Sequence, residues 1–200
     1  MQTKNTLSST ALPALDPGRI PIESQILVLF GHASELHSLV LQSLYLRASR
    51  GERLGVIVGD NRLNDYALAR LARGRGFDPS AVLAQIEFSR PFTCHQLHHC
   101  VLDLVGERID AWRALYVLGL LDTFWDEDIR YAEAMQLLGE ILARLRQIAA
   151  QNRSVLVTLS LPPAETTRQD MIARVLNAAD AYWQPSPRVV EHFVQQMSMW

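Results

Sequence analysis

Short apolar runs alternate with helical patterns along the chain between residues 21 and 184. Between the runs, apolar residues recur at helical spacing over residues 36–49, 64–74, 94–106 and 127–150. This alternation predicts an α/β fold with an open, mostly parallel sheet and helices on both faces. The Val, Ile and Leu content of the runs is typical of strands buried on both faces, and they lie at Ile26–Phe30, Leu54–Val58, Gln85–Ser89, Leu115–Leu118 and Val155–Leu159.

Two segments carry the pattern of a capping box, in which a Thr side chain and a Gln side chain close the first turn of a helix. They are Thr93-x-x-Gln96 and Thr166-x-x-Gln169. We therefore expect helices to begin at both places.

The chain of 200 residues suits one domain with a sizeable core. We expect a flexible lead-in over residues 1–20, a core domain over residues 21–184 and a C-terminal segment over residues 185–200. In that segment an apolar stripe at helical spacing either packs on the chain's own sheet edge or docks on a partner subunit. The stripe comprises Val189, Val190, Phe193, Val194, Met197 and Trp200.

The composition argues against several classes of protein. Nineteen Lys and Arg residues nearly balance 21 Asp and Glu residues, so no global charge favours nucleic acid or membranes. No run approaches the roughly 20 apolar residues of a membrane span, and the N-terminal residues lack the apolar stretch of a signal peptide. Two cysteines do not make a disulfide framework. These features predict a cytoplasmic protein.

The segment from Gly31 to Ser38 stands between a predicted strand and a predicted helix, which is the setting of the phosphate-binding loop GxxxxGK[ST]. Gly31 and Ser38 are in register with that pattern. Leu36 stands at the place of the second Gly, and His37 at the place of the Lys.

The order and spacing of these segments resemble the ATPase core of the RecA-like recombinases, the RecA, RadA and KaiC group. The resemblance rests on the loop above and on five further segments, which are Gly55–Arg62, Tyr66–Pro79, Ser89–Leu97, Arg113–Phe124 and Val155–Ser160. It implies a three-layer RecA-like P-loop fold, ATP with Mg²⁺ as cofactor, and assembly with itself or with another RecA-like or repair protein.

The departures from that pattern predict a vestigial phosphate loop. Leu36 adds a side chain where the backbone should approach the phosphates, and an imidazole at His37 is shorter than Lys and mostly neutral near pH 7. Glu35 would place a carboxylate beside them, at a cost of roughly 1–4 kcal/mol. Glu35 also suits the first turn of a helix capped by Ser34, with its side chain filling the anion site.

The second nucleotide motif also differs from the family pattern, and this difference also indicates a lost nucleotide site. In the family an Asp after the fourth strand orders the magnesium ion, and Gly119 stands at that place here. Asp122 could serve only if the strand ended later, and otherwise it is a solvated loop acid. Asp60 is at the place of the family's catalytic acid, but it would have nothing to activate without ligands for phosphate and magnesium.

A cluster of Cys and His from Cys94 to Cys100 raises the alternative of a zinc site. On a helix the ligands disperse: His95 and His99 share one face, while Cys94 has the spacing of a core residue. The two cysteines would lie about 9 Å apart along the axis, which is too far for a disulfide. We expect no metal here, with His95 and His99 as the weak candidates.

The segment Asp122–Asp128 is acidic and would repel nucleic acid, so contact with DNA has little support. Within it, Phe124 and Trp125 are either part of an interaction surface, together with Phe193 and Trp200, or a loop anchor.

The leading hypothesis from the sequence is a non-catalytic RecA-like protein that acts through protein association, as an accessory factor in DNA recombination or repair. One alternative is a RecA-like ATPase that binds ATP and Mg²⁺ through unorthodox ligands. A metal-dependent module built on the Cys/His helix is the third.

Overall fold

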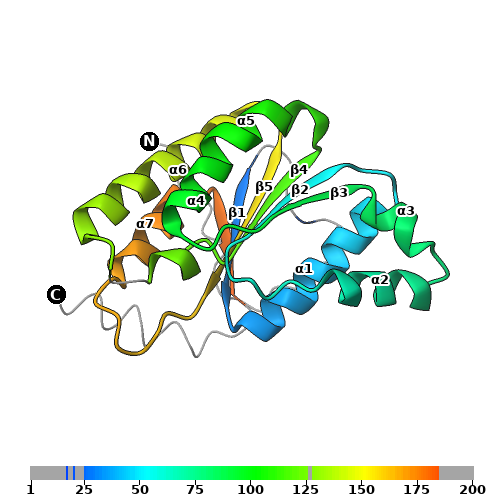
Figure 1. Cartoon of the computed structure of the whole chain (residues 1–200), viewed down its shortest axis with the longest axis horizontal. Coiled ribbons are helices and arrows are strands. Elements are labelled where there is room, and N and C mark those ends of the chain that lie inside the picture. Colours follow the sequence, from blue (N-terminus) through cyan, green and yellow to red (C-terminus); the bar gives the residue numbers. More distant parts are fainter. Residues whose placement is uncertain (1–16, 18–19, 21–24, 126–127, 185–200) are drawn as a thin grey trace.

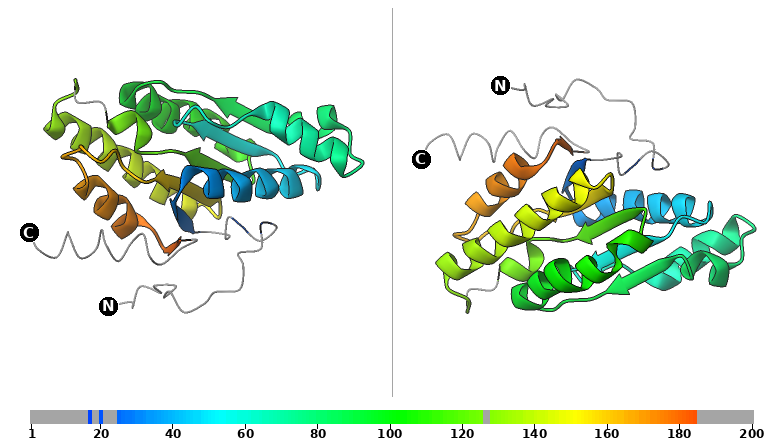
Figure 2. Two further views of the ribbon diagram at one scale, coloured as in Figure 1. Left: turned by 90° about the horizontal axis from the view of Figure 1, so that it is seen from below. Right: turned by 90° about the horizontal axis from the view of Figure 1, so that it is seen from above.

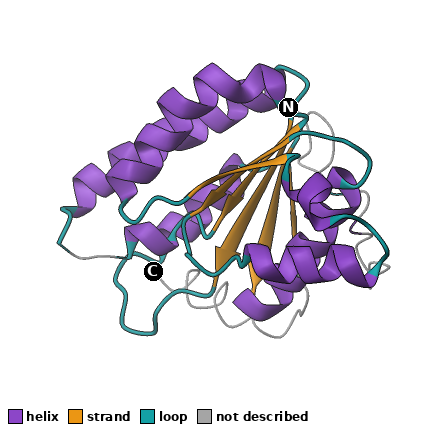
Figure 3. Cartoon of the chain, turned by 45° about the vertical axis from the view of Figure 1, so that its right-hand side comes forward, coloured by secondary structure: helices purple, strands orange, loops and turns teal. Residues whose placement is uncertain are grey.

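The computed structural model describes residues 17, 20, 25–125 and 128–184. Its centre is a six-stranded sheet in the order β3-β2-β4-β5-β1-β6, in which every pair of neighbouring strands is parallel. Helices lie on both sides of this sheet (Figure 3). The strands are β1 (Ile26–Gly31), β2 (Leu54–Val58), β3 (Ile86–Ser89), β4 (Ala114–Leu118), β5 (Ser154–Ser160) and β6 (Ala181–Trp183).

The helices divide between the two faces of the sheet (Figure 1). One face is covered by α1 (Ala33–Ala48), α2 (Asp65–Gly74) and α3 (Pro79–Leu83). The other is covered by α4 (Cys94–His99), α5 (Val105–Arg108), α6 (Tyr131–Ala150) and α7 (Asp170–Ala178). Figure 2 shows both layers from below and from above. The predicted α/β fold is confirmed, and it is consistent with the three-layer arrangement of RecA-like proteins.

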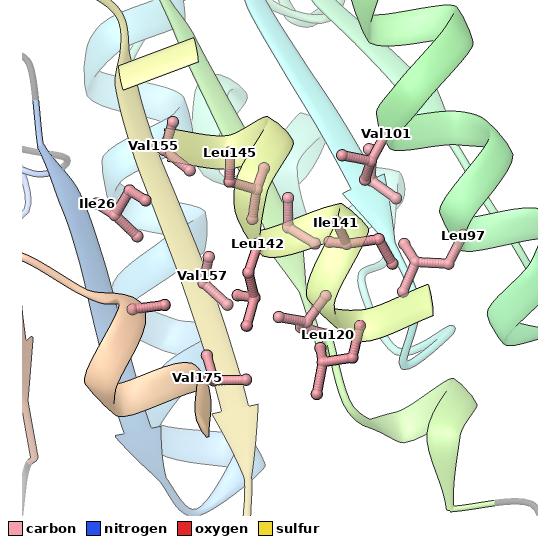
Figure 4. Close-up of a cluster of buried hydrophobic side chains, with 14 of the residues drawn as sticks. Ile26, Leu97, Val101, Leu120, Ile141, Leu142, Leu145, Val155, Val157 and Val175 are labelled. Carbon is pink, nitrogen blue, oxygen red and sulfur yellow. The ribbon is translucent and has the colours of Figure 1, made fainter. Parts of the chain in front are cut away.

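Alternation along the strands builds two apolar cores. In β1, Ile26, Val28 and Phe30 face the layer of α4–α7, whereas Leu27 and Leu29 face the layer of α1–α3. Successive side chains of a strand point to opposite faces, so a strand covered on both sides must be apolar throughout. Figure 4 shows part of the first core, where side chains of β1, β5, α6 and α7 meet.

The five predicted strands are all present, with ends that shift by no more than a residue. β6, which pairs with Leu27–Leu29 of β1 as an edge strand, was not predicted from the sequence. Nor was α3, whose start has two clear signals: the side chain of Asp78 accepts a hydrogen bond from Ser80 N, and Pro79 occupies the first turn.

Three predicted helix boundaries were wrong. The first helix begins at Ala33 rather than residue 36, and the long helix begins at Tyr131 rather than residue 127. The predicted helix 94–106 is divided into α4, a π-helical turn over Cys100–Leu104 and α5.

One of the two capping boxes forms in part. Thr93 Oγ1 accepts a hydrogen bond from Gln96 N at 3.2 Å, but Gln96 Oε1 accepts from Phe92 N instead of Thr93 N. The second prediction was wrong, because α7 begins at Asp170 and Thr166 Oγ1 accepts from Arg168 N within a turn.

The predicted C-terminal segment 185–200 and most of the lead-in 1–20 lie outside the described residues. Ile20 is an exception: it is buried against the α1 layer, and its carbonyl accepts a hydrogen bond from Ser43 Oγ at 2.7 Å. The end of the predicted flexible lead-in therefore belongs to the core. Among the described helices, none combines the length and the apolar character needed to cross a bilayer.

Candidate functional site

The carboxyl edge of a parallel sheet is the usual place for a ligand site in an open α/β fold, and here α1 follows β1 almost directly. β1 ends at Gly31 and α1 begins at Ala33, with the extended residue His32 between them. Residues 33–38 of the expected loop therefore belong to the start of α1. Leu36 and Val40, one helical turn apart, are both buried, and this apolar stripe extends the helix toward the strand.

The predicted role of Ser34 and Glu35 was wrong. The residue before the helix is His32, whose side chain makes no capping hydrogen bond. Both Ser34 and Glu35 are exposed, so the carboxylate of Glu35 does not fill an anion site. Its place in the first turn still complements the helix dipole.

The side chains of the former motif point in different directions. Leu36 packs into the core of the α1 layer. His37 turns toward the end of β2, while Ser38 lines a separate groove between α1 and α2. The positions that bind phosphate and magnesium in the family pattern are thus not gathered around one point.

His37 and Asp60 form an ion pair at this edge. His37 Nε2 lies 2.8 Å from Asp60 Oδ2, and only 2% of the Asp60 side chain is exposed. Asp60 Oδ1 accepts a hydrogen bond from Arg62 N at 3.1 Å. Burial alone raises the pKa of Asp60, but the hydrogen bonds from His37 and Arg62 and their nearby charges lower it below its ordinary value of 3.8.

Asp122 is the second acid that the structure brings to this place. Its Oδ2 atom is buried and has no hydrogen-bond partner among the described residues. Burial, followed by the negative charge of Asp60, raises the pKa of Asp122 to about 6. Asp60 and Asp122 were predicted as two separate candidates near the site, and not as neighbours.

Gly119 sits between the two acids and is required there. Its φ is +61°, and its N–H donates a hydrogen bond to Thr158 Oγ1 at 2.8 Å. A Cβ atom at this position would lie 2.4 Å from Asp60 Cβ and 2.7 Å from Asp122 Oδ2. An Asp at position 119, as the family pattern would have, does not fit this backbone or this space.

A hollow of about 520 Å³ opens beside the His37–Asp60 pair. It is lined by the first turn of α1, by His37, by Arg62 and by the end of β5 at Ser160. The sequence analysis gave Arg62 no role, although it follows the acid at the end of β2. The residues present do not fit ATP with Mg²⁺, because no loop wraps a phosphate, no Lys among the described residues lines the hollow, and the imidazole is held by Asp60.

The histidines of the Cys/His segment pair with acids. His95 lies 3.5 Å from Glu133 and His98 lies 2.6 Å from Glu140, so both tie α4 to α6. His99 pairs with Asp103 on its own helical segment at 2.7 Å. Cys94 is buried, and no disulfide joins it to Cys100. The described residues contain no group of three or more His, Cys, Asp or Glu side chains placed to hold a metal ion.

Of the two roles that the sequence left open for Phe124, an interaction surface or a loop anchor, its burial favours the loop anchor. Its side chain is completely buried, and Trp125 packs half-buried against the same core. The buried side chain of Arg168 holds this loop from the segment after β5: its Nη1 donates to the carbonyl of Phe124 at 2.8 Å and its Nη2 to that of Ile129 at 2.5 Å. The sequence analysis missed Arg168.

A scan against protein-family models finds no family that matches this chain. A search of curated proteins likewise finds no match.

Proposed function

We propose that this chain is a non-catalytic protein of RecA-like architecture that acts through protein association, as an accessory factor in DNA recombination or repair. The observation that carries the proposal is the direct connection of β1 to α1, with His37 paired to Asp60 beyond it. A nucleotide site would need that segment as an open loop.

Three further features support the absence of nucleotide chemistry. Leu36 is part of the core, so the helix cannot unwind into a loop without exposing it. Asp60 Oδ2 is already engaged by His37 Nε2 and is not free to orient a water molecule. Gly119 stands where a magnesium-ordering acid belongs, and the space around it excludes one.

Association is supported by aromatic side chains left on the surface. Tyr66 is 64% exposed and Phe92 is 70% exposed. The two segments that carry them are joined by Arg90, whose Nη2 lies 2.6 Å from Asp65 Oδ1 and whose Nη1 donates to the carbonyl of Leu63 at 3.0 Å. A rigid surface with exposed aromatic residues is typical of a protein interface. The partner in this proposal is a second copy or another RecA-like or repair protein in the cytoplasm.

A calorimetric titration with ATP and Mg²⁺ tests the proposal. We expect a dissociation constant in the millimolar range or weaker, equivalent to about 4 kcal/mol, and no release of phosphate. Micromolar binding that depends on Mg²⁺, and that is lost in Arg62→Ala, would instead support an ATPase with unorthodox ligands. Light scattering over a range of concentrations then tests for assembly of the chain with itself.

A further inference from the structure

We infer that the groove between α1 and α2 is a docking site for an acidic amphipathic helix of a partner protein. The inference rests on the proposed function and adds to it the place of contact and the chemistry of the partner. The groove has a volume of about 530 Å³. The two helices that form it lie side by side on one face of the sheet (Figures 1 and 2).

Both helices contribute apolar side chains to the lining of the groove, beside the polar Ser38 and Gln42 of α1. Leu41 of α1 and Ala67 and Leu71 of α2 line it, and the two leucines are only partly buried against the core below. Gly74, at the end of α2, adds no side chain, and a Cβ atom built there would meet nothing within 4 Å. An open groove with apolar side chains between two helices is a place where a third helix can pack.

The rim of the groove is basic. Arg70 and Arg75 line it, and Arg73 lies on the same helix. Arg73 in the last turn complements the dipole of α2, but Arg70 lies in the middle of the helix, where the dipole gives no reason for a cation. Arg70 is exposed and has no ion-pair partner among the described residues. The acid of α2, Asp65, is already paired with Arg90.

Charge complementarity therefore selects the occupant. A helix with Leu or Ala on one face and Glu or Asp along its flanks would cover the apolar side chains of the groove and meet Arg70 and Arg75. Nucleic acid suits the groove less well. Phosphates gain nothing from apolar side chains, and one face of the Tyr66 ring is covered by Arg73, whose Cζ lies 5.9 Å from the ring centre.

α2 is about 15 Å long, so the contact is small and we expect a dissociation constant on the order of 10 µM. The probe is a fluorescent peptide of about 18 residues, long enough to form a helix, with Leu at the i, i+3, i+4 and i+7 positions of one face, Glu along its flanks and Ala elsewhere. A scrambled peptide of the same composition and a peptide with Lys in place of Glu are the controls. Fluorescence anisotropy of the full chain should show binding of the acidic amphipathic peptide alone.

Four variants locate the contact. Arg70→Glu reverses a rim charge and Gly74→Glu places an acid in the open groove, and each should weaken binding by about tenfold or more. Gly74→Gln matches the bulk of Gly74→Glu without its charge and should weaken binding less. Arg146→Glu makes the same charge change on α6, on the opposite face of the sheet, and should leave binding unchanged. Because Arg70 and Arg146 are exposed and Gly74 has free space, all four should fold.

Several results would overturn the inference. The scrambled peptide could bind as tightly as the acidic amphipathic peptide, or the Arg70→Glu variant could bind that peptide as tightly as the wild type does. A single-stranded oligonucleotide could also bind more tightly than the peptide, with this binding abolished in Arg70→Glu. A doubled mass in light scattering that Arg70→Glu returns to the monomer would assign the groove to a second copy. The result of the nucleotide titration does not depend on any of these results. The docking site can therefore be disproved while the proposed function stands, and the proposed function can be disproved while the docking site stands.

Discussion

His37 Nε2 and Asp60 Oδ2 lie 2.8 Å apart at the carboxyl edge of the sheet, although β4 and β5 separate the strands that lead to them. The helix that follows β1 carries the imidazole to the end of β2. The pair thus connects two elements that share no hydrogen-bonded edge, and it gives a hydrogen-bond partner to a carboxylate side chain that is almost fully buried.

Asp60→Asn should destabilise the protein by about 1–2 kcal/mol at neutral pH, because the charge-assisted hydrogen bond to His37 is lost. The folded-state pKa of Asp60 is depressed. The stabilisation of the fold by ionised Asp60 is therefore fully present above the ordinary pKa of 3.8, and it is lost as the pH falls through the folded-state pKa. Chemical denaturation between pH 3 and 8 measures it. Asp103→Asn, which removes the acid of the exposed His99 pair, should cost no more than about 0.5 kcal/mol.

Asp122→Asn should have the opposite effect. The folded-state pKa of Asp122 is raised to about 6, so ionisation of its side chain destabilises the folded protein. This destabilisation begins above the ordinary pKa of 3.8 and is complete above about pH 6. After allowance for its partial exposure, we expect Asp122→Asn to be more stable than the wild type by about 1 kcal/mol at pH 7.5. The two curves should converge below about pH 4. A constant difference at every pH would contradict this account.

Gly119→Ala should destabilise the protein by more than about 2 kcal/mol, since the added methyl group meets the backbone and Cβ of Asp60. Gly51→Ala is the matched control: Gly51 also has a positive φ, of +80°, but a Cβ there meets nothing within 4 Å. It should cost only the backbone strain of about 1 kcal/mol. Thermal unfolding of both variants separates the effect of crowding from that of φ.

The strands could be predicted because burial on both faces forces an unbroken apolar run, as in Leu54–Val58. β6 could not, because a three-residue edge strand has too few positions to show a pattern. The first turn of α1 was misread because Gly31 and Ser38 matched the ends of a loop motif, whereas the burial of Leu36 decided the backbone.

The site was predicted in its parts but not in its connections. Asp60 and Asp122 were both identified as candidates, yet their proximity depends on how β2 and β4 pair, with Val58 beside Leu118. No local pattern shows that His37 reaches Asp60. Arg168 was missed for the same reason, because its partners Phe124 and Ile129 lie about 40 residues earlier in the chain.

Arg168→Met should loosen the loop around Phe124. The variant keeps an apolar stem but removes the donors to two carbonyl groups, at a cost of about 2–4 kcal/mol. We expect a lower melting temperature and faster proteolysis between β4 and α6. Arg174→Met, which changes an Arg of the neighbouring helix α7, should leave the proteolysis pattern of that loop intact.

The apolar stripe of the C-terminal segment provides a test of assembly. Phe193 and Trp200 lie outside the described residues, so this prediction rests on the helical spacing in the sequence. If the stripe docks on a partner subunit, replacing both by Ala should reduce the mass measured by light scattering and leave the melting temperature of the core unchanged. If the stripe packs on the chain's own sheet edge, the same change should lower the melting temperature by several degrees and leave the mass unchanged. Met199→Ala changes an apolar residue next to the stripe and should alter neither quantity. A wild-type chain that stays monomeric at high concentration, and whose melting temperature does not respond to the double change, would contradict both roles.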